Sequence, residues 1–332
     1  MDRTPLPMSF RDLAGAVAFA LAVACAPAIA AEPLQLEAKI PLGQVAGRID
    51  HMAFDAARHR LFVAELGNDS VGVVDVEARE VVHRIAGLRH PQGVGYLPSL
   101  DLLLVANATD GSVRLFGGAQ YAEAGRLDLG ADADNVRIDA AANRVLVGYG
   151  GGAIATIDPA SRRRVLDVSL PAHPESFQQD AGSHRVYVNL PDAKAIAVID
   201  PATQKVTSWP MQAGGNFPMA LRPAAQHVVV AFRRPARLGV FAMADGASVA
   251  SPDICGDSDD VFYDARRNLV YVSCGDGYLD VLDGKDYRRL AHIRTVAGAR
   301  TSLFVPEADR LYLAVRAGGA EPAAIWVFRP GS

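Results

Sequence analysis

Short apolar runs recur along this chain at a nearly constant interval. A four-residue phrase with at least three apolar members occurs seven times, ending at Val63, Val105, Val147, Val188, Val230, Val272 and Leu313. Successive phrases end 41 or 42 residues apart, as from 63 to 105 or from 147 to 188. Strand-length apolar runs separated by turn residues fill each interval, and no helical period is present. This repeat is typical of β-propeller blades.

The fourth repeat illustrates how one unit is divided into strands. Residues 175–179, 185–189, 195–199 and 205–209 are four candidate strands, and the last two flank a tight turn at residues 200–203. Four strands in about forty residues make one blade. The sequence therefore predicts an all-β fold, a seven-bladed β-propeller with four-stranded blades.

The two ends of the chain complement each other in this scheme. The outer strand of a blade begins about eighteen residues after the phrase, and in the seventh repeat that position falls near residue 331 of 332. The seventh blade therefore lacks an outer strand. We expect residues 36–42 to pair with residues 325–328 and to close the ring with an N-terminal strand.

The first thirty residues have the pattern of a secretory signal peptide. Arg3 and Arg11 provide positive charge, residues 13–26 are apolar, and Ala28–Ala30 matches a small-x-small cleavage site. The apolar run is too short for a stable membrane span. We therefore expect residues 1–30 to be removed and residues 31–332 to form the propeller, periplasmic or secreted, without a membrane span.

Net charge and cysteine content limit the partners and the cross-links that we expect. The formal net charge of −4 argues against nucleic acid as a partner. Cys255 and Cys274 are the two cysteines beyond the signal peptide, and antiparallel pairing of residues 260–263 with 269–273 would bring both to the same face. We expect them to form a disulfide within the sixth blade, because export exposes the chain to oxidising conditions.

The repeated phrase also carries a family resemblance. Together with the Val-Ile-Asp-Pro-Ala-Thr turn at residues 198–203, it resembles the YVTN-type propellers, and the exported members are similar to the YncE family. The resemblance covers residues 31–332 and implies the fold. Related propellers include binding proteins, lactonases and electron-transfer domains, so the resemblance leaves the function open.

One position of the repeat varies in a way that suggests a functional site. Thirteen residues before each phrase end, the chain has Asp50, Gln92, Asp134, Glu175, Phe217, Asp259 and Arg300. These residues begin the inner strands, which line the central channel of a propeller. With neighbouring polar residues and a second-strand end, the predicted ligand-binding set is Asp50, His51, Gln92, Asp134, Asn135, Glu175, Asn216, Asp259, Asp260, Arg300 and Arg233.

Several functions remain compatible with such a ring. Carboxylates beside arginines would complement a small molecule bearing both charges, or a protein loop at this top face, and binding is the more economical interpretation. Alternatively, the ring suits a divalent cation, most plausibly calcium, held by oxygen ligands from Asp50, Asp134, Glu175, Asn216 and Asp259. In a propeller-type lactonase or ester hydrolase, His51 is then the candidate catalytic, proton-transferring residue. A protein-interaction scaffold and a merely hydrated polar channel are the further alternatives.

Overall fold

A computed structural model gives the structure of the chain, describing residues 1–4, 32–319 and 321–331. The predicted signal peptide falls almost entirely outside the described residues. Within the described part, no helix is long and apolar enough to span a membrane. The propeller lies within the compact unit Glu32–Ser332.

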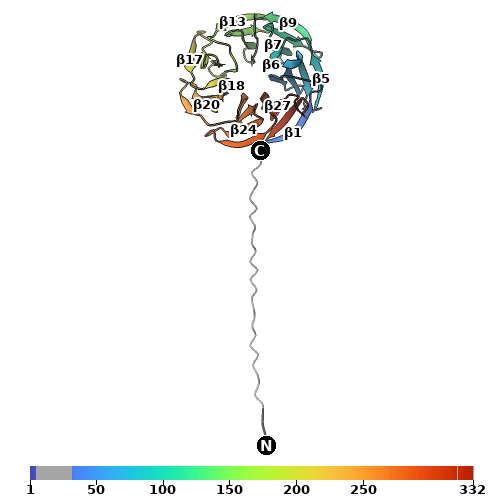
Figure 1. The fold of residues 1–332 in the computed structure, drawn as a ribbon, viewed down its shortest axis with the longest axis vertical. Coiled ribbons are helices and arrows are strands. Elements are labelled where there is room, and N and C mark those ends of the chain that lie inside the picture. Colours follow the sequence, from blue (N-terminus) through green and yellow to red (C-terminus); the bar gives the residue numbers. More distant parts are fainter. Residues whose placement is uncertain (5–31, 320, 332) are drawn as a thin grey trace. The chain divides into compact units, whose positions relative to one another are not determined.

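Seven four-stranded antiparallel sheets form this unit, as predicted. Figure 1 shows the sheets around a ring, with β6 and β18 near its centre and β5, β9, β13 and β17 at its rim. Blades one to four comprise β2 (Met52–Asp55), β3 (Arg60–Glu65), β4 (Ser70–Asp75), β5 (Glu80–Ile85); β6 (Pro91–Leu97), β7 (Leu102–Asn107), β8 (Ser112–Gly117), β9 (Ala122–Asp128); β10 (Val136–Asp139), β11 (Arg144–Tyr149), β12 (Ala153–Asp158), β13 (Arg163–Ser169); β14 (Phe177–Gln179), β15 (Val186–Leu190), β16 (Ala195–Ile199) and β17 (Val206–Pro210). Blades five to seven comprise β18 (Gly214–Arg222), β19 (His227–Arg234), β20 (Ala236–Ala242), β21 (Ser248–Ala250); β22 (Ser258–Asp264), β23 (Leu269–Cys274), β24 (Tyr278–Asp283), β25 (Arg289–Arg294); β26 (Ser302–Val305), β27 (Arg310–Val315), β28 (Ala324–Pro330) and β1 (Leu34–Pro41). Short 3-10 turns occupy Leu66–Asn68, Pro98–Leu100 and Pro223–Ala225.

The N-terminal strand closes the ring, as the repeat arithmetic predicts. β1 pairs antiparallel with β28, from Leu34 opposite Pro330 to Pro41 opposite Ala324. The side chains of Leu34 and Ile40 are fully buried. β1 thus takes the place of the missing outer strand and covers an edge that would otherwise expose unpaired backbone groups.

The core lies between adjacent blades. Between blades one and two, for example, Phe62 and Val73 are buried in the same apolar cluster as Leu103 and Val105. Alternation along each strand directs such residues to both faces of the sheet, so every blade packs against two neighbours. Burying one such side chain contributes roughly 1.5–3 kcal/mol, so the seven interfaces dominate the stability of the ring.

The predicted disulfide is confirmed. Cys255 and Cys274 are bonded, with their Cα atoms 5.8 Å apart, and both residues are buried. Cys255 N–H also donates to Asp280 Oδ2 at 2.8 Å, and Gly275 N–H donates to the carbonyl of Asp257 at 2.9 Å. These bonds fix the loop that leads from Cys255 to the channel.

Candidate functional site

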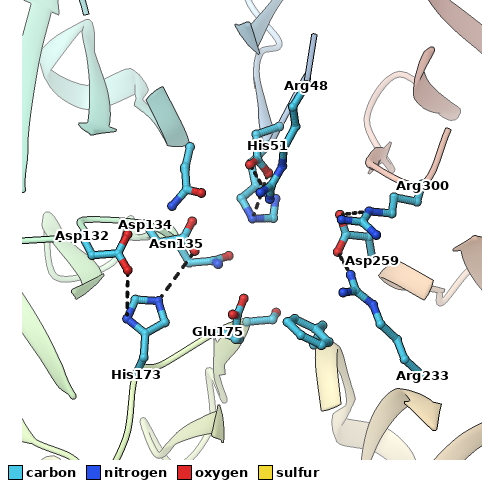
Figure 2. Close-up of a pocket in the computed structure, with 14 residues that line it drawn as sticks. Arg48, His51, Asp132, Asp134, Asn135, His173, Glu175, Arg233, Asp259 and Arg300 are labelled. Carbon is cyan, nitrogen blue, oxygen red and sulfur yellow. Dashed lines mark hydrogen bonds and ion pairs between the residues drawn. The ribbon is translucent and has the colours of Figure 1, made fainter. Parts of the chain in front are cut away.

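The inner ends of the blades surround a polar cavity at one mouth of the central channel. Its volume is about 200 Å³, and Figure 2 shows its lining. It is lined by Arg48, Asp50, His51, Gln92, Asp132, Asp134, Asn135, His173, Glu175, Ser176, Phe217, Arg233, Asp259 and Arg300. All the residues of the predicted binding set are therefore brought together here except Asn216 and Asp260.

The repeat itself places these side chains at one level. The backbone N–H of Asp50, of Asp134 and of Glu175 each donates to the second strand of its own blade, at 2.8, 2.9 and 3.0 Å respectively. Each bond extends the inner strand by the same amount in its own blade. Equivalent residues consequently begin their strands at the same depth in the channel, which is why the register of the sequence located the site.

Asp50 is a nearly inaccessible carboxyl on this ring, with only 1% of its surface exposed. Burial raises the pKa of Asp50 to about 6, although His51 and Arg48 oppose the shift. Arg48 Nη2 lies 2.7 Å from Asp50 Oδ2, as an ion pair without the direction of a hydrogen bond. His51 Nε2 lies 3.8 Å from Oδ1. Asp50 therefore has its own positive partner in Arg48.

Asp134 is accompanied by a histidine from the next blade. His173 Nδ1 lies 2.6 Å from the carbonyl oxygen of Gly150, and its Nε2 lies 3.9 Å from Asp134 Oδ2. That second distance is one of an ion pair rather than of a direct hydrogen bond. The Asp134 carboxylate and the Gly150 carbonyl raise the pKa of His173 to about 9, against the effect of burial. His173 is therefore cationic at neutral pH and lies between two carboxylates, Asp134 and Asp132, whose Oδ2 is 3.7 Å from its Nδ1.

Glu175 differs from both neighbours because its carboxylate has no hydrogen bond or ion pair within the described chain. Burial, followed by the nearby charge of Asp134, raises the pKa of Glu175 to about 7, while His173 and His51 oppose the shift. Figure 2 shows Glu175 projecting into the cavity between the His173 wall and the Arg233 wall. It is an uncompensated acid at the centre of the site.

The arginine wall is already neutralised. Arg300 donates from Nη1 to both carboxylate oxygens of Asp257 at 2.7 Å, and its Nε lies 3.1 Å from Asp259. Arg233 is also paired with Asp259, and its guanidinium lies 3.7 Å from the ring centre of Phe217. Two arginines and two aspartates balance here. This wall supplies shape and rigidity and leaves little charge for a ligand.

Asn135 contributes an unused hydrogen-bond acceptor. The residue is 1% exposed, and its Oδ1 has no hydrogen-bond partner among the described residues. In Figure 2 its side chain is directed into the cavity beside Asp134. An unsatisfied buried polar atom costs about 1–3 kcal/mol, so this oxygen is a favourable place for a donor from a bound molecule.

Two predicted residues lie elsewhere. Asn216 does not line the mouth, because it stands one residue before the repeat position that Asp50 and Glu175 occupy in their blades, and its Nδ2 donates to the carbonyl of Ala195 at 2.9 Å. Phe217 takes its place in the lining. Asp260 lies deeper, where its Oδ2 accepts a hydrogen bond from Ser302 N–H at 2.7 Å. Burial raises the pKa of Asp260 to about 7.

A second cavity, which we call the chamber, continues the channel below the mouth. It has a volume of about 360 Å³, and its wall combines apolar residues of the inner strands, such as Met52 and Phe262, with polar groups. His51 and Ser176 line both cavities, so the two are adjacent. The polar lining also includes Arg137 and Asp260.

Sequence reasoning did not include four of the charged residues of these cavities, namely Arg48, Asp132, His173 and Arg137. Arg48, Asp132 and His173 precede the inner strands by a few residues in loops whose direction the repeat does not define. Arg137 could have been identified from the repeat. Ten residues before the phrase end, the other six repeats have Ala53, Gly95, Gln178, Ala220, Phe262 and Leu303, so an arginine stands out.

The geometry gives no support to the predicted calcium site. Among the described residues, the one group of three or more metal-ligating side chains with donor atoms within 4.8 Å of each other is Cys255, Cys274 and Asp276. Its cysteines are joined in the disulfide and cannot act as thiolate ligands. The carboxylates of the mouth are not gathered in this way, and Asn216 is directed elsewhere.

Comparisons with known proteins support the fold alone. No family model and no curated protein matches the chain, so the resemblance to the YVTN and YncE groups is not confirmed. A solved structure described as hydrazine synthase from Kuenenia stuttgartiensis is similar, with a TM-score of 0.72 and 16% sequence identity over 80% of this chain and 91% of that chain. At this identity the likeness says nothing about activity. It places the chain among the β-propellers and assigns it to no family.

Proposed function

We propose that this protein is an exported binding protein that holds a small monocation, such as a primary ammonium group, at the mouth of its channel. The observation that carries the proposal is the carboxylate of Glu175 without an ion pair, facing a cavity that Asn135 also lines, with its unpartnered Oδ1 buried at the edge. The buried disulfide supports an oxidising compartment.

Charge compensation around the cavity determines the kind of ligand. Arg48 accompanies Asp50, His173 accompanies Asp134, and the arginine wall is balanced by its own aspartates. Asp132 is half-exposed and shares His173 with Asp134, so Glu175 is the one acid of the described lining without an ion pair, and a single positive charge would compensate it. An ammonium group has three donors, enough for Glu175, Asn135 Oδ1 and one further oxygen. Hydrogen bonds that involve a charged group contribute about 1.5–3 kcal/mol each.

The size of the cavity restricts the ligand further. Sites for drug-sized molecules occupy about 300–1,000 Å³, whereas the mouth has about 200 Å³. The bound group should therefore have few heavy atoms. The calcium-dependent hydrolase is not favoured by any specific observation, because its oxygen ligands are not assembled.

Calorimetric titration of the mature protein with n-butylamine at pH 8 tests the proposal. We expect saturable binding, and we expect Glu175→Gln to weaken it at least about tenfold because the charged acceptor is lost. Glu80→Gln, an exposed carboxylate on β5 without an ion pair among the described residues, is the matched control. Absence of binding to the wild-type protein, or equal binding by Glu175→Gln, contradicts the proposal.

A further inference from the structure

The chamber contains an arginine without a counter-ion. Arg137 lies on β10, where its Nη1 donates to the carbonyl of Val136 at 2.9 Å and its Nη2 donates to Ser176 Oγ at 3.3 Å. Both partners are neutral. No carboxylate of the described chain lies within ion-pair distance of this guanidinium, whose face is 5.5 Å from the ring centre of Phe177.

This arrangement is unfavourable for the empty protein. Burial lowers the pKa of Arg137, opposed by the more distant charges of Asp260 and Asp134. A cation removed from water without a close anion carries a desolvation cost that neutral hydrogen bonds only partly offset. Because Arg137 is buried, its attraction to an anion that enters the chamber is screened less than at the protein surface. A ligand anion would relieve this cost.

The two charged groups line adjacent cavities of the channel. Ser176 accepts a hydrogen bond from Arg137, lines both cavities, and directly follows Glu175 in the chain. Glu175 lines the mouth and Arg137 lines the adjacent chamber, so a ligand that extends from one cavity into the other would meet both charges. Apolar side chains of the inner strands form part of the wall between them.

We propose that the chamber is a carboxylate subsite and that the ligand is a small aliphatic amino acid with a terminal ammonium group. This inference rests on the proposed function, which assigns the ammonium group to Glu175. The planar guanidinium of Arg137 binds the ligand carboxylate, and the methylene groups lie against the apolar wall. The chamber holds one arginine and, farther from it, the carboxyl group of Asp260, so a ligand with a single negative charge is matched better than a phosphate dianion.

A probe series separates this inference from the proposed function. The mature protein is titrated calorimetrically with n-butylamine, with butyrate, and with amino acids from 3-aminopropanoate to 6-aminohexanoate. We expect the tightest amino acid to bind at least about tenfold more strongly than n-butylamine, because a charge-assisted pair is added. This comparison requires no variant and does not depend on whether a substitution folds.

Variants then assign the gain to Arg137. Arg137→Met should remove the advantage of the amino acid and leave n-butylamine binding unchanged, whereas Arg137→Lys should retain part of it. Glu175→Gln should weaken both kinds of ligand. Arg294→Gln, an exposed arginine on β25, is the control for loss of a positive charge. Circular dichroism and melting curves verify that each variant is folded.

The outcomes distinguish the two proposals. If n-butylamine binds as tightly as every amino acid and Arg137→Met changes the binding of neither, the chamber is not a carboxylate subsite. The proposed ammonium site at the mouth is then not contradicted. That result would fit a partner protein presenting a lysine side chain. If no amine binds to the wild-type protein, both proposals fall.

Discussion

The uncompensated state of Glu175 makes the stability of the free protein depend on pH in a defined direction. A glutamate in an unfolded chain titrates near 4.5, whereas burial raises the pKa of Glu175 to about 7 in the folded protein. Between these values the folded state binds more protons than the unfolded state, so stability falls as pH rises through this window. Below about pH 4.5 both states are protonated and the penalty is absent.

Replacing Glu175 by glutamine removes this titration while keeping the shape of the side chain. The displacement from 4.5 to about 7 corresponds to about 3 kcal/mol at about 1.4 kcal/mol for each pKa unit. Part of this penalty is shared with Asp134 and the two histidines, so we expect Glu175→Gln to be more stable than wild type at pH 8 by about 1–3 kcal/mol. At pH 4.5 we expect little difference.

Urea denaturation of wild type, Glu175→Gln and the control Glu80→Gln at pH 4.5 and pH 8 measures these differences. The slopes of the transitions should agree, so that midpoints report stability directly. Equal stability of Glu175→Gln and wild type at pH 8 would refute the reasoning, because it would mean that the carboxylate ionises without cost. A gain of the same size at both pH values would point to packing instead of charge.

Three further predictions concern the scaffold. Deleting residues 34–42 should lower the melting temperature sharply or cause aggregation, since it exposes the edge of β28; unchanged melting would contradict the closure by β1. The unfolded, unreduced mature protein should have no titratable thiol, and replacing Cys255 and Cys274 by serine should cost roughly 3 kcal/mol in urea denaturation, whereas two reactive thiols would disprove the bond. Gly93→Ala should destabilise the protein by at least about 2 kcal/mol, because its Cβ would lie 1.9 Å from the carbonyl oxygen of Asp134; wild-type stability would show that the blades adjust freely.

The fold could be predicted from the sequence because each blade repeats the same pattern of apolar positions. The period fixed the number of blades, and the end of the chain near residue 331 exposed the need for an N-terminal strand. β1 begins at Leu34, two residues before the predicted boundary at residue 36, because Leu34 still pairs with Pro330. Strand ends depend on such individual bonds, which the period does not specify.

The residues of the candidate site could be predicted from the sequence only where the register of the repeat determines their position. Asp50, Asp134 and Glu175 occupy equivalent positions and line the mouth together, whereas Asn216 stands one residue before the equivalent position, which Phe217 holds. Asn216 was included for its polarity, and polarity does not determine the direction of a side chain, which here donates to the carbonyl of Ala195. The sequence also did not show which acids of the mouth are neutralised, because the pairing of Arg233 with Asp259 depends on side-chain directions.

Closure by β1 has a consequence for how the chain acquires its structure. Gln35 and Arg329 are neighbours across the closing sheet although 294 residues separate them in sequence. A chain is synthesised from its N-terminus, so β1 has no partner until residues 324–330 have been made. Contacts of such high sequence separation slow folding. The seventh blade therefore requires both β1 and β28, so a chain that lacks either strand cannot complete this sheet.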